Sequence, residues 1–289
     1  MFAPLRRARL VPGAVAAVLA LAACGAAPAA PPAGTATPST ITPAPATALV
    51  GSAGVRPAAP TVTTSAAVPS TGRPRVVVLD PGHNGGNAGA PSAINRQVPD
   101  GRGGTKACNT TGTSTDAGYP EHAFTFAVAK LVGQRLTARG VQVVLTRDDD
   151  TGVGPCVDVR GRAGERAGAD AVVSIHADGA GPADRGFHVA YSDPPLNDAQ
   201  RGPARTLAAD LRDGLARAGF PPSTYIGRQG LSPRTDLAGL NLATRPTALV
   251  ECANMRNAGE AAVVSSAAGR DRYAAAIADG VLRFLDGGS

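Results

Sequence analysis

Short apolar runs rich in β-branched residues alternate with helical stripes over most of the chain, and this alternation limits the fold more than any other feature. The runs have the length and composition of buried strands and cover residues 75–80, 141–146, 171–176, 186–191 and 247–251. Apolar residues recur at helical spacing over residues 121–140, 207–215 and 273–284. Strands that alternate with helices favour an α/β fold with a largely parallel sheet covered on both faces.

The amino-terminal residues have the organisation of an export signal. Three arginines precede an apolar stretch, Leu10–Ala23, that is too short to span a membrane comfortably. The stretch ends in Leu-Ala-Ala followed by Cys24, which resembles the lipobox of bacterial lipoproteins. We therefore predict a lipoprotein-type signal peptide over residues 1–23 and lipidation of Cys24. An ordinary signal peptide with an incidental cysteine is the alternative, and the choice between the Sec and twin-arginine routes stays open.

Residues 24–72 are predicted to be a tether rather than a domain. The segment from Gly25 to Gly72 holds nine prolines and one charged residue, Arg56. Such a composition cannot bury enough apolar surface to offset the entropy of folding, and its prolines favour an extended spacer. The sequence therefore predicts a disordered Pro/Ala/Thr-rich tether, and a single globular domain over residues 73–289. A lipid on Cys24 would anchor this domain at the outer face of the cytoplasmic membrane, and the tether implies a substrate that stands off the membrane.

The net charge of +6 does not indicate a nucleic-acid partner. Residues 1–72 contain four arginines and no acidic residue, so the rest of the chain has 28 − 4 = 24 basic and 22 acidic residues. The whole chain has six Phe, four Tyr and no Trp. A nearly neutral domain with few aromatic residues lacks the basic stripe and the stacking surface that nucleic-acid binding requires. We expect a monomer without a nucleic-acid partner.

Export changes how the cysteines are interpreted. Cys108 and Cys156 both lie in predicted loops, and loop cysteines in an oxidising compartment favour a disulfide. In the chain-entropy model such a bridge stabilises by roughly 3–5 kcal/mol. Cys252 ends an apolar strand and is interpreted as a small buried thiol.

Ionisable residues follow three of the predicted strands, at the point where each strand ends. His83 comes shortly after the first strand, His176 ends the third, and Glu251 ends the last. The carboxyl ends of parallel strands meet at one edge of a sheet, where functional sites gather. Glu121 begins a predicted helix after a glycine-rich loop. His83, Glu121 and His176 could supply a zinc site with an open fourth position, which leaves Glu251 as a base.

Each of these residues also has a structural interpretation. A histidine at a strand end is often hydrogen-bonded to the backbone, and Glu121 at a helix start interacts favourably with the helix dipole. Glu251 could be half of a buried ion pair with Arg245 or Arg256. The gathering of all four residues at one sheet edge favours the metal site.

Four ordered motifs give the chain a family resemblance. They are LDPGHNG at Leu79–Gly85, Glu121 at the start of a helix, SIHAD at Ser174–Asp178, and PTALVE at Pro246–Glu251. Over about residues 74–286 the chain resembles the zinc-dependent N-acetylmuramoyl-L-alanine amidases of the amidase-3 type, and within them the compact mycobacterial subgroup.

The resemblance implies a fold, a cofactor and a reaction. The fold is a single αβα sandwich around a mixed, mostly parallel sheet. Zn²⁺ is bound by His83, Glu121 and His176, and Glu251 is the catalytic acid/base. The substrate is the amide bond between N-acetylmuramic acid and the L-alanine of the peptidoglycan stem peptide.

Candidate substrate contacts come from the local sequence. Many relatives have a Gly-Phe pair after the catalytic glutamate, whereas here Asn254 and Arg256 follow Glu251 in a form similar to the mycobacterial subgroup. We therefore consider Arg234, Asn241 and Asn254 as substrate-binding residues. Arg234 could pair with a stem-peptide carboxylate, and a surface role is the alternative.

Two further features of the sequence are interpreted by position. The polar loop from Pro91 to Pro120 is predicted to contain a small hairpin held by the Cys108–Cys156 disulfide and to border the groove. His122 and His188 match no motif position, and we interpret both as structural or surface residues.

Other functions are weighed against the amidase. A zinc peptidase or deacetylase would use the same ligands, and a non-catalytic wall-binding lipoprotein would keep the fold without turnover. The chain has no G-x-S-x-G motif for a serine hydrolase, and a buried Cys252 is a poor nucleophile. Residues 82–89 imitate a phosphate loop but lack its Lys-Ser/Thr ending.

Overall fold

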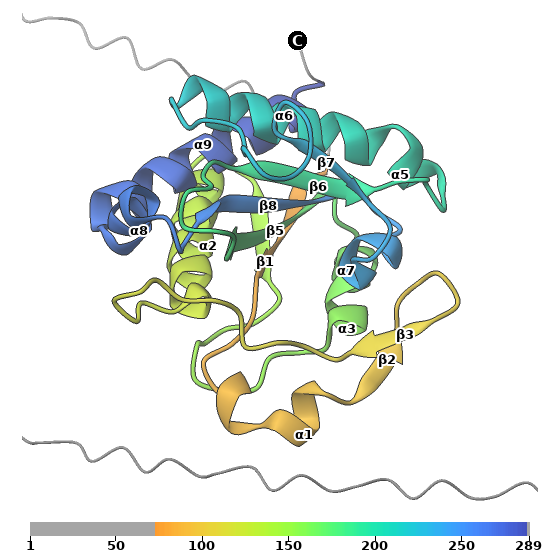
Figure 1. Cartoon of the computed structure of the whole chain (residues 1–289). Coiled ribbons are helices and arrows are strands. Elements are labelled where there is room, and N and C mark those ends of the chain that lie inside the picture. The colour runs from red at the N-terminus through yellow and green to blue at the C-terminus, as the bar shows by residue number, and fades with distance from the viewer. Residues whose placement is uncertain (1–72, 288–289) are drawn as a thin grey trace, which may run out of the picture. The chain divides into compact units, whose positions relative to one another are not determined.

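The computed structural model describes residues 73–287, so the predicted leader, Cys24 and the tether lie outside the described residues. A six-stranded sheet in the order β4-β1-β5-β8-β6-β7 forms its centre (Figure 1). The strands are β1 (Val76–Pro81), β4 (Gln142–Leu145), β5 (Ala171–Asp178), β6 (His188–Ser192), β7 (Leu231–Arg234) and β8 (Thr247–Asn254). Neighbouring strands run parallel except β6 and β8, which are antiparallel. The mixed, mostly parallel sheet is confirmed.

Helices cover the two faces of the sheet unequally (Figure 1). The long helices α2 (Glu121–Thr137), α6 (Pro203–Arg217) and α9 (Ala267–Leu285) pack on one face, here called the core face. The short helices α3 (Val157–Gly161), α4 (Ala163–Arg166) and α7 (Ala238–Asn241) lie against the other, here called the second face. Helix α5 (Asp198–Arg201) leads into α6, and α8 (Ala258–Ser265) leads into α9. This is the predicted αβα sandwich.

The alternation of side chains along the strands explains the two layers. In β1 and β5, Leu79, Val173 and Ile175 point into the large core beneath the long helices. Val78 and Val172, which directly precede Leu79 and Val173 in sequence, pack on the second face in a small cluster near α4. Both faces of these strands are therefore covered, as a continuous apolar run in a parallel sheet requires.

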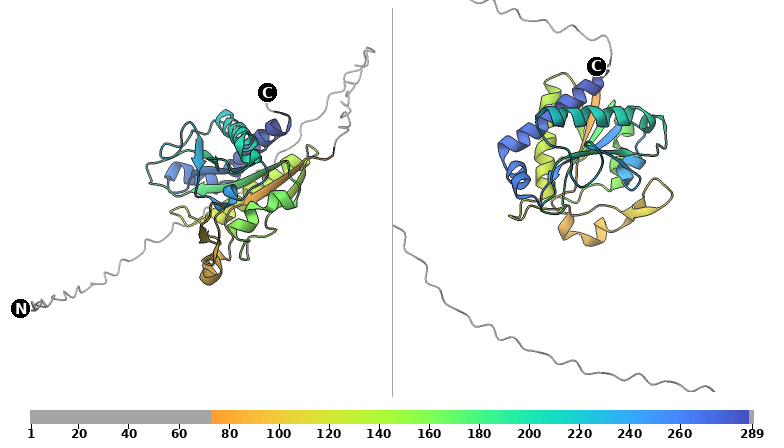
Figure 2. Two further views of the ribbon diagram at one scale, coloured as in Figure 1. Left: turned by 90° about the vertical axis from the view of Figure 1, so that its right-hand side faces the viewer. Right: turned by 45° about the horizontal axis from the view of Figure 1, so that its top comes forward.

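A long excursion between β1 and α2 carries the predicted hairpin. It contains a 3₁₀ turn η1 (Asn87–Gly89), the short helix α1 (Pro91–Ile94) and the antiparallel strands β2 (Gln97–Pro99) and β3 (Thr105–Ala107). Cys108 follows β3 and forms the predicted disulfide with Cys156 at the start of α3. Figure 2 shows this excursion at one end of the described domain. Its tip is fastened to the sheet, because Arg102 donates to the Ser192 hydroxyl at 3.0 Å.

The edge strand β7 is absent from the sequence prediction. It has only four residues, includes Pro233 and buries only Ser232, so it shows neither β-branched enrichment nor clear alternation. Among the helices of residues 73–287, none is long and apolar enough to span a bilayer.

Candidate active site

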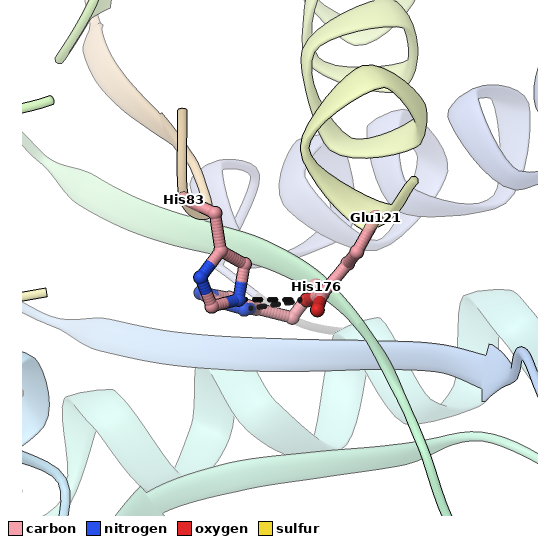
Figure 3. Close-up of side chains that lie close together, drawn as sticks. All are labelled: His83, Glu121 and His176. Carbon is pink, nitrogen blue, oxygen red and sulfur yellow. Dashed lines mark hydrogen bonds and ion pairs between the residues drawn. The ribbon is translucent and has the colours of Figure 1, made fainter. Parts of the chain in front are cut away.

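Three side chains converge at the carboxyl end of the sheet. The potential ligand atoms of His83, Glu121 and His176 all lie within 4.8 Å of one another. Oε1 of Glu121 is 3.1 Å from Nε2 of His83 and 3.0 Å from Nδ1 of His176. Figure 3 shows the three side chains pointing toward one another from the loop after β1, the start of α2 and β5. The structure thus brings together the three residues that the sequence selected as zinc ligands.

Local backbone geometry places His83. It has a φ of 59°, in the left-handed region that residues other than glycine rarely adopt. At Gly82, a Cβ atom would lie 2.2 Å from Cε1 of His176, so only glycine lets the chain pass the second histidine. Nδ1 of His83 lies 3.0 Å from the Thr110 carbonyl, and a hydrogen bond from Nδ1 to this carbonyl would make Nε2, the atom that faces Glu121, the ligand atom.

Both carboxylate oxygens of Glu121 accept hydrogen bonds from the backbone. Oε2 accepts a hydrogen bond from the backbone of Thr113 at 2.9 Å, and Oε1 accepts one from the backbone of Ala177 at 3.2 Å. Burial alone would raise its pKa, but hydrogen bonds with His176 and His83 lower the pKa well below the ordinary value. The group is therefore a fixed carboxylate, as a metal ligand must be.

A buried ion pair supports the ring of His176 from the opposite side. The Asp80 carboxylate accepts from Nε and Nη2 of Arg160 at 2.7 and 2.9 Å, and from the hydroxyls of Thr146 and Ser174 at 2.7 Å each. Nη2 of Arg160 also lies 3.4 Å from Nε2 of His176. Burial would raise the pKa of Asp80, but Arg160 and the hydroxyls lower it strongly. No motif or periodicity points to Arg160, which lies in a five-residue helix.

Glu251 lies beside the cluster on β8, in register with His176 on β5. Its Oε2 atom is buried and has no hydrogen-bond partner among residues 73–287. Burial raises its pKa well above the ordinary value, the negative charges of Glu121 and Asp178 add to this, and Arg234 acts in the opposite direction. No ion pair with Arg256 forms, because that guanidinium is 2.8 Å from Asp116.

The cluster and Glu251 line one cavity of about 510 Å³ on the second face of the sheet. Its floor is made of the strand residues that face this side, including Glu251, Leu249 and Thr247 on β8. Helices α3 and α7 and residues 106–113 form its walls. The loop containing the hairpin therefore borders the groove, as predicted.

The predicted substrate residues divide into one that is partly accessible and two that are not. Arg234 has a side chain 25 % exposed and forms two bonds with Asp236, at 2.7 and 2.6 Å. These bonds, with the charges of Glu251 and Asp178, raise its pKa despite partial burial. It thus lies close to the active-site cavity and keeps its positive charge.

Asn241 and Asn254 are buried, and their amides are fully used within the protein. Oδ1 of Asn241 accepts from Arg102 and Ser192, and its Nδ2 donates to two backbone carbonyls. Oδ1 of Asn254 accepts from two backbone amides, and its Nδ2 donates to two carbonyls. This geometry argues against substrate contact through either amide, because the donor and acceptor sites of both are occupied by protein partners and both amides brace loops.

The remaining candidates occupy distinct environments. His188 is 1 % exposed, and burial lowers its pKa to about 4, so it is a neutral structural residue. Cys252 faces the core, and burial raises its thiol pKa well above the ordinary value, which agrees with an inert thiol. His122 is 22 % exposed at its side chain and is 2.7 Å from Asp150.

Known proteins of similar sequence and structure were found for this chain. The family model described as N-acetylmuramoyl-L-alanine amidase matches residues 77–283. A curated N-acetylmuramoyl-L-alanine amidase from Mycobacterium tuberculosis is 48% identical over 223 residues, which are 77% of this chain and 91% of that protein. The structure of the N-acetylmuramyl-L-alanine amidase Ami1 from Mycobacterium smegmatis is 53% identical, covers 73% of this chain and 97% of its own, and gives a TM-score of 0.72. Ami1 from Mycobacterium abscessus is also 53% identical, with coverage of 73% and 98% and a TM-score of 0.71.

Proposed function

The chain belongs to the amidase-3 family of N-acetylmuramoyl-L-alanine amidases, and on that premise we propose that it works with one zinc ion held by His83, Glu121 and His176 and with Glu251 as acid/base. As a member of this family it is a peptidoglycan hydrolase that cleaves the amide between N-acetylmuramic acid and L-alanine. One observation carries the proposed mechanism. Two imidazoles and a carboxylate lie within 4.8 Å of one another, in the same cavity as Glu251, whose Oε2 atom is buried and unpaired.

The donor set suits the proposed metal. Two histidines and one glutamate with an open position are a typical catalytic zinc site, and the bond from His83 to Thr110 is the kind of support that orients a ligand. When bound, zinc polarises the scissile carbonyl and lowers the pKa of bound water to about 7. Asp80 holds the Arg160 guanidinium, and Nη2 of Arg160 lies 3.4 Å from Nε2 of His176, which helps to orient that ring.

Glu251 performs the proton transfers in this proposal. Its carboxylate takes a proton from the attacking water as the water oxygen bonds to the scissile carbonyl carbon. The protonated carboxyl then gives that proton to the L-alanine nitrogen as the C–N bond breaks. The products are a lactyl carboxylate on the sugar and a free amine on the peptide. The burial that raises the pKa of Glu251 supports both roles, because the group can then hold a proton between the two steps.

Neither alternative weighed from the sequence is favoured. A zinc peptidase or deacetylase would fit the same ligands, but the matching family and the mycobacterial relatives are N-acetylmuramoyl-L-alanine amidases. A wall-binding protein without turnover would not need a competent carboxyl at position 251. The test is digestion of soluble muropeptides by the purified protein, with products identified by mass spectrometry. We expect an intact stem peptide, loss of activity with a zinc chelator and recovery with Zn²⁺; cleavage within the stem would contradict the proposal.

We also propose that the enzyme is a monomeric lipoprotein at the outer face of the cytoplasmic membrane. The support is the sequence of residues 1–72. Its arginines and apolar stretch are typical of a leader over residues 1–23, the Leu-Ala-Ala-Cys24 motif is typical of an acylation site, and the proline-rich segment suits a tether that would let the catalytic domain reach the wall. In a bacterial host, Cys24→Ala is expected to release the protein from the membrane fraction. Retention of the variant in that fraction would contradict lipidation, and sedimentation of the soluble variant tests the monomer.

A further inference from the structure

A second cavity lies beside the metal cluster and is not used by the proposed chemistry. This outer cavity, of about 390 Å³, is lined by Asn84, Gly85, Ala88, residues 111–114, Pro120 and His122. It shares Gly112 and Thr113 with the active-site cavity, so that short stretch of chain separates the two. Asn84 and His122 directly follow the proposed ligands His83 and Glu121 in sequence. The outer cavity is therefore next to the reaction centre and large enough for a small-molecule group.

His122 is oriented within this cavity by a charged pair. Its Nδ1 lies 2.7 Å from Oδ2 of Asp150, and Oδ1 of Asp150 is held at 3.0 Å by Arg147, whose side chain is only 4 % exposed. A carboxylate at this distance keeps the hydrogen on Nδ1. Nε2 makes no hydrogen bond to any atom of residues 73–287, so a residue that lines the outer cavity has a polar atom without a protein partner.

The chemistry of the reaction decides which half of the substrate lies on each side. Glu251 must reach the nitrogen of the leaving L-alanine, and Glu251 lines the active-site cavity but not the outer one. The peptide therefore leaves through the active-site cavity. The acyl half of the substrate, which carries the muramic acid sugar, extends away from Glu251, past the metal cluster and the stretch formed by residues 112–113.

We propose that the outer cavity is the subsite for the N-acetylmuramic acid sugar, and that Nε2 of His122 accepts a hydrogen bond from a sugar hydroxyl or from the N-acetyl N–H. This inference rests on the proposed function, because the direction of the substrate is taken from the role of Glu251. The hydroxyl of Ser114 is a second polar group on the same wall. Sugars bind through such hydroxyl and imidazole groups, whereas the floor of the active-site cavity includes apolar residues such as Leu249.

The test compares two substrates that differ only in the sugar. One is a soluble disaccharide peptide, and the other is the same peptide carrying a 2-methoxypropanoyl group in place of the muramoyl group. His122→Asn retains an amide group to bond with Asp150 but removes the atom at the Nε2 position. We expect the ratio of kcat/KM for the disaccharide peptide to that for the sugar-free peptide to fall about three- to tenfold, mainly through KM, as for the loss of one hydrogen bond.

A second variant changes a cavity-lining residue in a different segment of the chain. Ser114→Phe fills the outer cavity and is expected to lower the ratio of the two kcat/KM values by at least as much. Gln134→Asn, at an exposed position farther along α2, is the matched control, and we expect it to leave this ratio unchanged. Metal content and melting temperature, measured for every variant, separate a sugar contact from damage to Glu121. If the wild type cleaves the sugar-free peptide too slowly to assay, inhibition by free N-acetylmuramic acid is compared instead, with a three- to tenfold weaker effect expected in the variants.

The sugar subsite is overturned if both variants lower cleavage of the two substrates equally, or if neither changes the ratio or the inhibition by the sugar. A wild-type enzyme that cleaves within the stem peptide, or that works undiminished with a chelator, contradicts the proposed function instead. The two failures are therefore distinguishable in the same set of assays.

Discussion

Along β1, β5 and β8, successive side chains turn alternately to the core face and to the second face, and the two sets differ in chemistry. On the core face the strands present apolar residues such as Leu79, Ile175 and Val250 to the long helices. On the second face their neighbours in sequence are Asp80, His176 and Glu251, and these line the cavity.

The comparison shows how one sheet separates stability from chemistry. The core face buries its residues in one large cluster under α2, α6 and α9. The second face is covered only by helices of four or five residues, so it has room for a cavity and must satisfy its buried polar groups one by one. A change on the core face should therefore act on folding, and a change on the second face should act on turnover or on the response to pH.

The largest expected effect is the loss of turnover in Glu251→Gln. The amide has nearly the shape of the carboxyl but cannot transfer a proton, so we expect kcat to fall by about 10²–10⁴. The melting temperature should stay the same or rise, because an unpaired buried acid is removed. Measurement of kcat with muropeptides, of bound zinc and of melting checks all three. Turnover near the wild-type rate would exclude Glu251 as the acid/base.

Leu211→Ala makes the corresponding change on the core face. Leu211 is fully buried between α6, α9 and the sheet, so its truncation leaves a cavity and should lower the free energy of unfolding by about 3–5 kcal/mol. The kcat/KM of the folded fraction should remain close to that of the wild type, since Leu211 lines neither cavity. Denaturant unfolding and assays below the melting temperature test this. A large fall in kcat/KM without loss of stability would contradict the division between the faces.

The two faces also differ in how much of their structure can be predicted from the sequence. Strands and long helices of the core face were predicted because continuous β-branched runs and helical stripes leave a periodic signal. The proposed ligands and Glu251 were found because they stand at strand ends and in ordered motifs. Helices α3 and α7 gave no such signal, since four or five residues cannot establish a period, and Arg160 was missed with them.

The two asparagines show a different limit of sequence reasoning. Asn241 and Asn254 were selected because they are polar and near the expected groove, but polarity alone does not distinguish a ligand contact from an internal brace. Only the three-dimensional partners of each amide decide this. His122, which we interpret from the sequence as a structural or surface residue, lines a second cavity, and Asp150 orients its ring. The sequence carries no signal for this environment.

Reduction of the Cys108–Cys156 disulfide should have an intermediate effect, and mainly on the second face. The bridge joins the hairpin loop to the start of α3, which both border the active-site cavity. We expect the free energy of unfolding to fall by about 3–5 kcal/mol and activity to decrease. The double variant Cys108→Ser/Cys156→Ser is the control for the reductant. Unchanged turnover and melting after verified reduction would show that the hairpin does not depend on the bridge.

The smallest expected effect is a pH dependence contributed by Asp80. Burial raises the pKa of this group, but Arg160 and the neighbouring hydroxyls lower it below the ordinary value of 3.8. The unfolded chain therefore binds the proton more readily than the folded chain. The contribution of the Asp80 carboxylate to the free energy of unfolding is therefore complete above about pH 4. It is lost as the pH falls further, by about 1 kcal/mol for each pH unit.

Two variants isolate this contribution from other titrating groups. Asp80→Asn destabilises at neutral pH because Arg160 stays buried without its carboxylate, so the difference from the wild type should shrink between pH 4 and pH 3. The destabilisation by Leu211→Ala should stay constant over the same range, because no charged group on the core face is removed. Urea unfolding at each pH gives both differences. Equal slopes for the two variants would mean that the charges buried on the second face do not set the acid sensitivity of the fold.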